Sequence, residues 1–596
     1  MGLGGKLGGR CAHWALIGVQ VEPNRCFSRI TTMETEAGGC LPPVSGVQWC
    51  VGEEVPDMFG SILVALAISI GAPGEFQGSS AVDQPVLVDG RLVFPEGARI
   101  PKYMTENELR YLDGNLITPP RGQSAPPLGP VRGASEYEEM QGILLAWEGF
   151  SSTLAQMAAA ITTTGNADVY IACDSNSEAN SARNSCISAG ADPDRVITVV
   201  RSTNTVWIRD YGPRYVFEGD CRVIIDHTYN RPRPSDNAYN SYFGSAFNHA
   251  VYEIPLVHGG GNYHLNGIGT SAATELIINE NPSLSGSQII EYWRQYQNVE
   301  TYLHDAFPTS VDYTQHIDMW MLMCGDERII ISDWPTQSGS TQDQICDAAV
   351  EYYEGLGWEV FRTPAFAQGG THYTYTNMVV CNDVILLPEY NDISNTYDNQ
   401  AVVAVQAAMP GREVVQIVCD NLAYSAGVMH CITMHMPAHA GGIYPTTCLQ
   451  TPVEGIVDPN DCPQISYISD DDEFDVVSVD IEYSTDDGVT WQTLQSNLAP
   501  QGVATVCLPD TPTNQGRLRV LARDGDGNTG GDVSGPIIIE GDGVEGDVDG
   551  DGDVDVSDIL EILAQWLCQG DCSADVNGDG SVDVADVLLA LANYSP

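Results

Sequence analysis

The stretch GILLAWEGFSSTLAQMAAAITTTGNADVYIAC, residues 142–173, decides the fold class of the central region. Its ends, GILLAW (142–147) and ADVYIAC (167–173), are short apolar runs typical of buried strands, and TLAQMAAAITTT (153–164) between them is helix-like. We therefore predict an α/β domain over residues 131–450. Similar strand and helix patterns recur in RVIIDH (222–227), RIIISDW (328–334), QDQICDAAVEYYEGLG (342–357) and DVILLPEY (383–390).

The residue pattern and composition of the sequence change on both sides of this region. Alternating polar and apolar residues in VVSVDIEYSTDDGVTWQTL (476–494) and GRLRVLARD (516–524) predict an immunoglobulin-like or fibronectin-like β-sandwich over residues 455–540. Cys462 and Cys507 are spaced so that they could bridge its sheets, but the sequence leaves the pairing open. The Pro- and Gly-rich residues 81–130 predict a linker.

Residues 1–80 are interpreted as a leader, with a possible signal peptide around 58–73. The apolar run FGSILVALAISI (59–70) suits the core of a signal peptide and is too short to span a bilayer. We expect a secreted or cell-surface protein without an integral membrane span. The residues before this run would then belong to a different start of translation.

The charge of the chain limits its partners. Its 596 residues include 80 acidic and 25 basic side chains, which give a formal net charge of −55. Such a surface repels polyanions, so nucleic acid is an unsuitable partner and cationic ligands are favoured. Only two residues are lysines, Lys6 and Lys102.

The acidic tail, residues 541–596, contains a duplicated loop. DVDGDGDVDVSD (547–558) is matched by DVNGDGSVDVAD (575–586), with oxygen-bearing side chains at loop positions 1, 3, 5, 9 and 12 and Gly at position 6. This spacing surrounds one point with the oxygen ligands that Ca²⁺ prefers. The predicted calcium ligands are Asp547, Asp549, Asp551, Asp555 and Asp558 in the first loop, and Asp575, Asn577, Asp579, Asp583 and Asp586 in the second.

Aspartate at position 12, instead of the usual glutamate, and the duplicated loop-helix unit make the tail resemble a dockerin module. The resemblance implies docking onto a cohesin-bearing partner protein. A purely structural role for the calcium sites is the alternative.

Several polar clusters punctuate the predicted α/β domain. A thiol, a histidine and two or more carboxylates among them suggest a nucleophile, an acid/base group and a clamp for a cation. The clusters are VWIRDYGP (206–213), YNRPRP (229–234), HGGGNY (258–263), YTQHIDMW (313–320), TYTN (374–377) and GVMHCIT (427–433).

The ordered series WIRDYGP, GGGN, HIDMW, YTN and HC resembles the agmatine deiminase and porphyromonad-type peptidylarginine deiminase family. The resemblance implies a pentein fold, which is a five-fold pseudosymmetric α/β propeller of ββαβ-like units, and hydrolysis of a guanidinium to a ureido group and ammonia. It implies no cofactor for catalysis. The roles that it implies are Cys431 as nucleophile, His316 as general acid/base, Asp210 and Asp318 as guanidinium ligands, Asn377 as support for the nucleophile, and Trp207 and Tyr313 as walls of the substrate site.

Which guanidine the site accepts depends on the residues that meet the substrate at the end opposite its guanidinium. Arg231 and Arg233 in YNRPRP match arginines that hold the carboxylate of a C-terminal arginine in bacterial peptidylarginine deiminases, so we expect peptidyl-arginine, with a C-terminal arginine, to be converted to citrulline. Agmatine deiminase is the first alternative, and an arginine-specific deiminase or amidinotransferase is another. A calcium-dependent adhesive protein that binds without reacting is an alternative of a different class.

Overall fold

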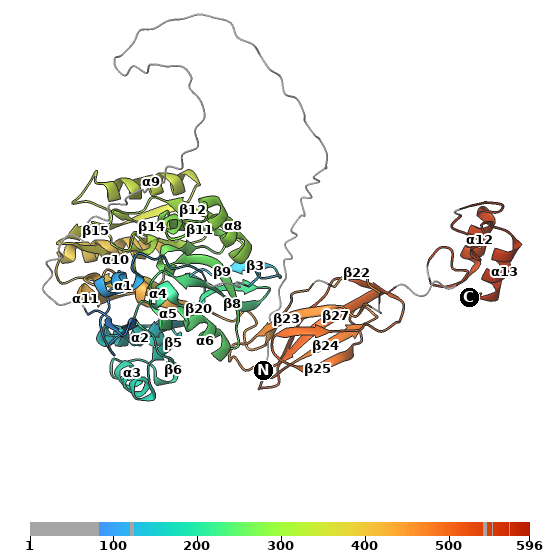
Figure 1. Cartoon of the computed structure of the whole chain (residues 1–596), viewed down its shortest axis with the longest axis horizontal. Helices are drawn as coiled ribbons and strands as arrows, with labels where there is room; N and C mark the ends of the chain where they lie inside the picture. The colour runs from blue at the N-terminus through green and yellow to red at the C-terminus, as the bar shows by residue number, and fades with distance from the viewer. Residues whose placement is uncertain are drawn as a thin grey trace, which may run out of the picture. The chain divides into compact units, whose positions relative to one another are not determined.

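The computed structural model describes residues 83–119, 124–451, 453–458, 461–539, 545–550, 552–570 and 572–595 (Figure 1). The predicted leader, residues 1–80, and its possible signal peptide lie outside the described residues. None of the helices in the described ranges is long and apolar enough to cross a membrane.

Between residues 131 and 437, all of which are described, five sheets share one pattern. In each, a central strand pairs antiparallel with one neighbour and parallel with the other, and helical residues join the parallel pair. The central triplets are β7 (Arg214–Glu218), β8 (Cys221–Tyr229) and β9 (Ala250–His258); β10 (His264–Leu265), β11 (Thr270–Thr274) and β12 (Glu300–His304); β13 (Met321–Gly325), β14 (Arg328–Asp333) and β15 (Glu359–Gln368); β17 (Val379–Cys381), β18 (Val384–Glu389) and β19 (Glu413–Val418); and β20 (Met434–Pro437), β4 (Met140–Ala146) and β5 (Asp168–Cys173).

These five ββαβ-like units are the architecture expected of a pentein, which confirms that part of the prediction. The fifth unit closes the ring, because β20 at the end of the domain pairs antiparallel with β4 at its start, with His435 opposite Ile143. Edge strands extend three of the sheets, namely β3 (Val131–Gly133), β6 (Val196–Val200) and β16 (Thr371–Thr374).

The residues 142–173 form strand, helix and strand as predicted. Helix α2 (Ser151–Thr163) buries Leu154, Met157, Ala158 and Ile161, whose spacing places them on one face. Figure 1 shows the longer helices toward the rim of the domain and the short helix α4 near its middle. The other helices between paired strands are α5 (Pro234–Asn237), α6 (Tyr239–Ala246), α7 (Leu276–Glu280), α8 (Gly286–Gln297), α9 (Thr341–Gly355) and α10 (Asn395–Ala408), and α3 (Asn176–Ser188) follows β5.

The connections from one unit to the next carry the predicted catalytic motifs. Each contains a short turn, and neighbouring turns are in contact with one another at the centre of the ring. They are α4 (Ile208–Tyr211), η2 (Gly260–Asn262), η3 (Ile317–Met319), the turn at residues 374–377, and η4 (His430–Ile432), which follows α11 (Asp420–Ala423).

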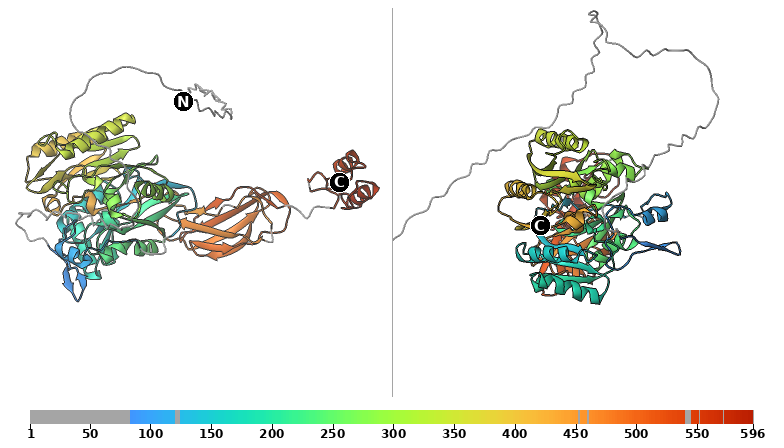
Figure 2. Two further views of the ribbon diagram at one scale, coloured as in Figure 1. Left: turned by 45° about the horizontal axis from the view of Figure 1, so that its top comes forward. Right: turned by 90° about the vertical axis from the view of Figure 1, so that its left-hand side faces the viewer.

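The predicted linker, residues 81–130, contains ordered structure. It forms a hairpin of β1 (Val86–Val88) and β2 (Arg91–Val93) and a helix, α1 (Glu106–Leu112). The hairpin projects from the body of the catalytic domain (Figure 2). Helix α1 begins after Thr105, whose side chain and that of Glu108 form a capping box.

The region after the catalytic domain forms two sheets that share the core of Ile465, Val479, Ile481, Leu518 and Val520. Cys462 and Cys507 form a disulfide there. Strand β21, which the predicted boundary at residue 450 assigns to the α/β domain, pairs instead with β23. The strands are β21 (Thr446–Leu449), β23 (Gln464–Asp470) and β26 (Gly502–Thr505) in one sheet, and β22 (Gly455–Ile456), β29 (Ile537–Ile539), β27 (Thr513–Arg523), β24 (Ser478–Ser484), β25 (Gln492–Leu498) and β28 (Thr529–Val533) in the other.

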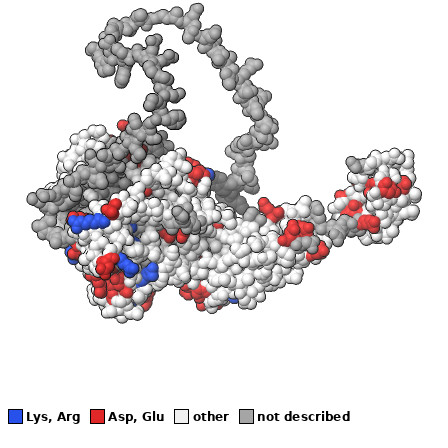
Figure 3. Space-filling view, in the orientation of Figure 1, with Lys and Arg blue, Asp and Glu red and all other residues white. Residues whose placement is uncertain are grey.

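The described part of the tail contains α12 (Val556–Ala564) and α13 (Val584–Ala592). Their apolar sides enclose a small core that includes Val554, Ile562 and Ala590. A disulfide joins Cys568 and Cys572. On the face drawn in Figure 3, acidic side chains recur along the chain and basic ones appear in only a few places, as the net charge requires.

Candidate active site

The predicted nucleophile, Cys431, lies fully buried in η4. Asn377 holds it from two sides: its Nδ2 lies 3.2 Å from Sγ, and its Oδ1 accepts a hydrogen bond of 3.3 Å from the Cys431 backbone N–H. An oxygen of Asp318 lies 3.5 Å from the same sulfur. The sulfur thus faces a carboxylate and an amide donor in a site closed to solvent.

The two predicted guanidinium ligands come from different units of the ring. Asp210 lies in α4 and Asp318 in η3, and both side chains are fully buried. The Nζ atom of Lys102 lies between them, 3.5 Å from Asp210 and 3.9 Å from Asp318, and 2.9 Å from Sγ of Cys431. The carboxylates therefore hold a cation next to the thiol.

The predicted acid/base, His316, precedes η3 and is fully buried. Its Nδ1 lies 3.5 Å from Asp210. The glycines of HGGGNY make this arrangement possible: a Cβ at Gly261 would lie within 2.9 Å of atoms of His316, Asp210 and Asp318. The structure therefore brings together all five residues predicted to be catalytic.

The pKa values of the thiol, the two carboxyl groups and the imidazole depend on burial and on the charge of Lys102. Burial, with the Asp318 carboxylate next, raises the pKa of Cys431 to about 12, although Lys102 opposes this. Burial would also raise the pKa of Asp210 and of Asp318, but the ammonium of Lys102 and the interactions with His316 and His430 together outweigh it and lower both pKa values below the ordinary one. Burial, with the charge of Lys102 next, lowers the pKa of His316. At neutral pH the site therefore holds a thiol, a neutral imidazole and two carboxylates.

Lys102 is the residue of the site that sequence reasoning missed. It belongs to the segment predicted as a linker, in no recognised motif, and it is fully buried. Asp210 and Asp318 raise its pKa against the effect of burial. Its only signal in the sequence was the scarcity of lysine, which carries no information about position.

A second missed group orients Asp318. His430 lies between two acids, with Nδ1 2.9 Å from Asp318 and Nε2 2.8 Å from Glu136. Arg209 pairs with Glu136, whose pKa it lowers, together with His430, against the effect of burial. His430 and Arg209 directly precede Cys431 and Asp210 within the quoted motifs, so their positions were available in the sequence, but Glu136 lay in none of them.

The two arginines of YNRPRP differ in burial, since Arg231 is half-buried and Arg233 is buried. Arg231 donates from Nε to the backbone carbonyl of Lys102 at 3.2 Å. Arg233 is fully buried and pairs with Glu108 of α1, with Nε 2.8 Å from a carboxylate oxygen, and its Nη2 donates to the carbonyl of Pro101 at 2.8 Å. Both arginines therefore contact the N-terminal segment.

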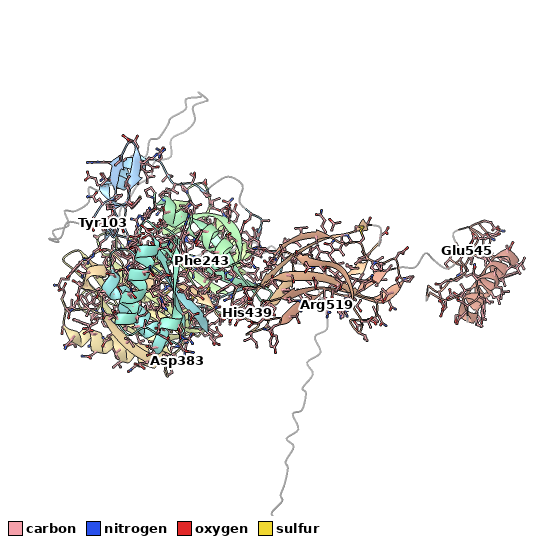
Figure 4. The ribbon with its side chains drawn as sticks, turned by 90° about the horizontal axis from the view of Figure 1, so that it is seen from below. Tyr103, Phe243, Asp383, His439, Arg519 and Glu545 are labelled. Atoms are coloured by element: carbon pink, nitrogen blue, oxygen red, sulfur yellow. A yellow bond between two sulfur atoms is a disulfide. The ribbon has the colours of Figure 1, made fainter. Side chains whose placement is uncertain are left out.

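The predicted walls of the substrate site contact the same segment. The indole Nε1 of Trp207 donates to the carbonyl of Ile100 at 2.8 Å. The ring of Tyr313 lies against that of Tyr103, with 4.9 Å between centroids. Tyr103, labelled in Figure 4, lies where the N-terminal segment meets the catalytic domain.

Glu280 lies beside Arg231 in a cavity that both help to line. Burial raises the pKa of Glu280 to about 7, although Arg231 opposes this. One carboxylate oxygen bonds Asn230, and the other is buried without a hydrogen-bond partner among the described residues. The outer part of the site thus offers both a cation and an acid.

The Porphyromonas-type peptidyl-arginine deiminase model matches residues 135–437. The chain belongs to this family. As a member it is a hydrolase that acts on guanidino C–N bonds, and the geometry of Cys431, Asp210 and Asp318 suits that chemistry. The match ends close to β20, where the ring closes.

Proteins that resemble this chain include "Putative agmatine deiminase" from Shewanella baltica (strain OS185), which is 26% identical over 290 residues, 41% of this chain and 77% of the relative. The protein of the same name from Marinomonas sp. (strain MWYL1) is 24% identical over the same shares. Among solved structures, agmatine deiminase of Enterococcus faecalis is 20% identical, with a TM-score of 0.47 over 54% of this chain and 99% of that one. Agmatine deiminase of C. jejuni is 18% identical, with a TM-score of 0.44 over 54% and 98%.

The predicted calcium ligands lie in two loops with the same internal hydrogen bonds. Asp547 accepts from the N–H of Gly552, and Asp575 accepts in the same way from Gly580. Ligand atoms of Asp547, Asp549 and Asp558 lie within 4.8 Å of one another. Asp551 lies outside the described residues. Of the remaining predicted ligands, Asp555 and Asp583 cap α12 and α13. The other three accept hydrogen bonds from backbone N–H groups of the second loop; they are Asn577, Asp579 and Asp586.

Proposed function

We propose that this protein converts peptidyl-arginine to citrulline and ammonia, with arginine at a peptide's C-terminus as the preferred substrate. The observation that carries the proposal is the cation held by Asp210 and Asp318 at 2.9 Å from the sulfur of Cys431. A guanidinium in that place would have its N–H edges on the carboxylates and its carbon in front of the nucleophile.

The reaction starts with transfer of the thiol proton to neutral His316, which the positive charge of the bound guanidinium assists. Sulfur then adds to the guanidinium carbon. The imidazolium of His316 returns the proton to one nitrogen, the C–N bond breaks and ammonia leaves, so that a thiouronium remains on Cys431. His316 next takes a proton from water, the hydroxide adds to the same carbon, and cleavage of the C–S bond releases the ureido product.

The position of Arg231 supports a substrate with a carboxylate. Arg231 donates to the backbone carbonyl of the residue whose side chain reaches the catalytic centre. In a C-terminal arginine the corresponding atoms are those of the α-carboxylate. A charge-assisted hydrogen bond to it contributes about 1.5–3 kcal/mol, whereas the amine of agmatine would be repelled by the guanidinium.

Formation of ureido product from three substrates tests the proposal: a peptide that ends in arginine, a peptide with internal arginine, and agmatine. We expect the first to have the highest kcat/KM and Cys431→Ala to abolish all turnover. Arg231→Ala should weaken turnover of the carboxylate-bearing peptide and should not lower turnover of agmatine, because it also removes the repulsion of the amine. Turnover of agmatine alone would refute the peptide substrate, and full activity of Cys431→Ala would refute the mechanism.

Agmatine remains the second candidate because of Glu280. This buried carboxyl group beside Arg231 could pair with a terminal amine, and the curated relatives carry the name of agmatine deiminase. Glu280→Gln distinguishes the two candidates. It should lower kcat/KM for agmatine selectively if agmatine is the substrate, and it should affect the C-terminal arginine peptide little if that is the substrate.

The C-terminal module is proposed to bind two Ca²⁺ ions and to dock onto a cohesin-bearing partner. Val556, Leu560 and Leu588 expose apolar side chains on α12 and α13, which offers a surface for such a partner. A secreted or cell-surface location belongs to the same proposal, and the disulfides Cys462–Cys507 and Cys568–Cys572 support an oxidising compartment. N-terminal sequencing of the mature protein tests the location, and a cohesin-binding assay with and without Ca²⁺ tests the docking.

A further inference from the structure

A segment of the chain itself occupies the site where substrate must bind. Residues 98–108 lead from the β1–β2 hairpin into α1, and the side chain of Lys102 extends to Cys431, Asp210 and Asp318. The four residues predicted to bind substrate all contact this segment. Trp207 and Arg233 bond the carbonyls of Ile100 and Pro101, Arg231 bonds that of Lys102, and Tyr313 packs on Tyr103.

The covalent structure of lysine explains what Lys102 imitates. Counted from Cα, the ammonium nitrogen of lysine is the fifth side-chain atom, and the guanidinium carbon of arginine is the fifth as well. The Nζ atom of Lys102 therefore marks the place that the reacting carbon of an arginine would take. Its distance of 2.9 Å from Sγ of Cys431 is close to that of a reactive approach.

We infer that residues 98–108 are an intrasteric inhibitor, which binds the catalytic centre as an arginine-containing polypeptide would, with Lys102 as a pseudosubstrate. The inference rests on the proposed function for the identity of the substrate. Beyond that function, the inference states that the site accepts a residue with polypeptide on both sides. It also states that the full chain is catalytically inactive until the segment leaves the site.

Lysine is suited to this role because it cannot react. Its fifth side-chain atom is a nitrogen without a multiple bond, so sulfur has no carbon to add to and there is no ammonia to expel from a tetrahedral adduct. The ammonium still neutralises the two buried carboxylates, which would otherwise repel each other. The complex is therefore stable and unproductive.

The rest of the segment holds Lys102 in place. Its backbone N–H donates to the carbonyl of Ser425 at 3.0 Å. Three residues further on, the capping box of Thr105 and Glu108 starts α1, and the same Glu108 forms the fully buried ion pair with Arg233. Because the inhibitor is tethered, its effective concentration at the site reaches the millimolar range.

The alternative is that Lys102 is a permanent member of the active site, which neutralises Asp210 and Asp318 throughout the reaction. Its Nζ, however, lies where a guanidinium would contact Asp210, Asp318 and Cys431, and the two cations cannot occupy one space. Turnover of any guanidine therefore requires Lys102 to withdraw. A permanent Lys102 predicts that its removal lowers activity, whereas an inhibitor predicts the opposite.

The first experiment measures kcat/KM of the full chain and of Lys102→Ala for the three substrates above. We expect Lys102→Ala to be at least tenfold more active than the unchanged chain on the preferred substrate. The matched control is Arg110→Ala in α1, just after the segment, which removes an exposed cation paired with Glu106 and should leave activity unchanged. Activity of folded Lys102→Ala equal to or below that of the unchanged chain would overturn the inference.

The second experiment uses Lys102→Arg, which keeps the positive charge, places the guanidinium carbon at the fifth side-chain position, and should fold even if Lys102→Ala does not. Residue 102 should become citrulline, as one nitrogen leaves as ammonia and one oxygen enters from water, and peptide mass spectrometry would detect the exchange. Lys102→Arg with Cys431→Ala should remain arginine. Intact arginine at position 102 in a protein that deiminates free peptides would overturn the pseudosubstrate.

The outcomes also separate this inference from the proposed function. If Lys102→Ala is activated toward agmatine and toward no peptide, the inhibitor stands and the peptide substrate fails. If the unchanged chain deiminates peptides as fast as Lys102→Ala does, the proposed function stands and the inhibitor fails.

Discussion

The side-chain amide of Asn377 donates to the sulfur of Cys431 at 3.2 Å, and its carbonyl oxygen accepts from the backbone N–H of the same residue at 3.3 Å. One side chain thus fixes the position of the nucleophile and offers a hydrogen bond to its anionic form. The two contacts join the fourth and fifth connections of the ring.

Replacement of Asn377 by alanine is therefore expected to lower kcat by about 10- to 100-fold, which is the effect of losing one hydrogen bond to a charged group. KM should change little, because Asn377 donates to the thiol and to the backbone carbonyl of Asp318, and not to the carboxylates of the two guanidinium ligands. Steady-state kinetics on the preferred substrate, together with the pH dependence of alkylation of Cys431, provides the measurement. A loss confined to KM would assign Asn377 to substrate binding instead.

Gly261 is expected to tolerate no side chain. In Gly261→Ala the added methyl group would lie within 2.9 Å of atoms of His316, Asp210 and Asp318, and these buried side chains must move. We expect activity to fall by more than a hundredfold, since displacements of about 1 Å have effects of this size. The control is Gly355→Ala at the end of α9, where a methyl group meets no atom within 4 Å. Equal activities of the two variants would contradict the described packing around Gly261.

Glu148 should make the catalytic domain less stable as the pH rises. Burial raises its pKa from 4.5 to about 9, and the carboxylates of Asp174 and Glu178 add to the rise. Below pH 4.5 both the folded and the unfolded forms are protonated. Between pH 4.5 and about 9 only the unfolded form ionises, so the free energy of unfolding decreases across this interval.

Glu148→Gln removes this dependence and should increase the free energy of unfolding at pH 8 by an amount on the order of 2 kcal/mol, with little effect at pH 4.5. Melting temperatures at the two pH values provide the measurement, with the exposed Glu413→Gln as control. A stabilisation that is the same at both pH values would show that Glu148 does not titrate in this range.

Calcium is expected to stabilise the tail. Carboxylates concentrated in two short loops repel one another, and binding of Ca²⁺ to the folded form alone raises its stability. Calorimetry should give two ions per chain, and Asp547→Ala should remove one of them. Glu561→Gln on the exposed side of α12 is the matched control. An unchanged melting curve in chelator and the absence of binding heat would refute both sites.

The sequence predicted most where local pattern determines structure. The periodicity of residues 142–173 specified β4, α2 and β5, and the motifs around Asp210, His316 and Cys431 specified the reacting groups. Their convergence was available only through the resemblance, because these residues lie on different units of the ring. Spacing also could not decide whether Cys462 pairs with Cys507, which the structure does show.

Lys102, in the predicted linker, and Glu136, outside the quoted motifs, escaped prediction because their roles depend on contacts between distant parts of the chain. A Pro- and Gly-rich stretch lacks the periodicity of regular elements, and residues 98–105 take their conformation from hydrogen bonds to the catalytic domain, such as those of Trp207 and Arg233. Contacts of this kind between distant parts of a chain leave no local signal. The short helix α1 did carry one, the Thr105–Glu108 capping box.

The scarcity of lysine gives the buried ammonium a practical value. Since Lys6 and Lys102 are the only lysines in the chain, reductive methylation with isotope-labelled formaldehyde adds at most two modified side chains to its spectrum. An amine enclosed among Cys431, Asp210 and Asp318 is shielded from the reagent, so the rate at which Lys102 acquires label reports how often the enzyme opens. The chain thus contains its own probe of activation, readable without any substrate.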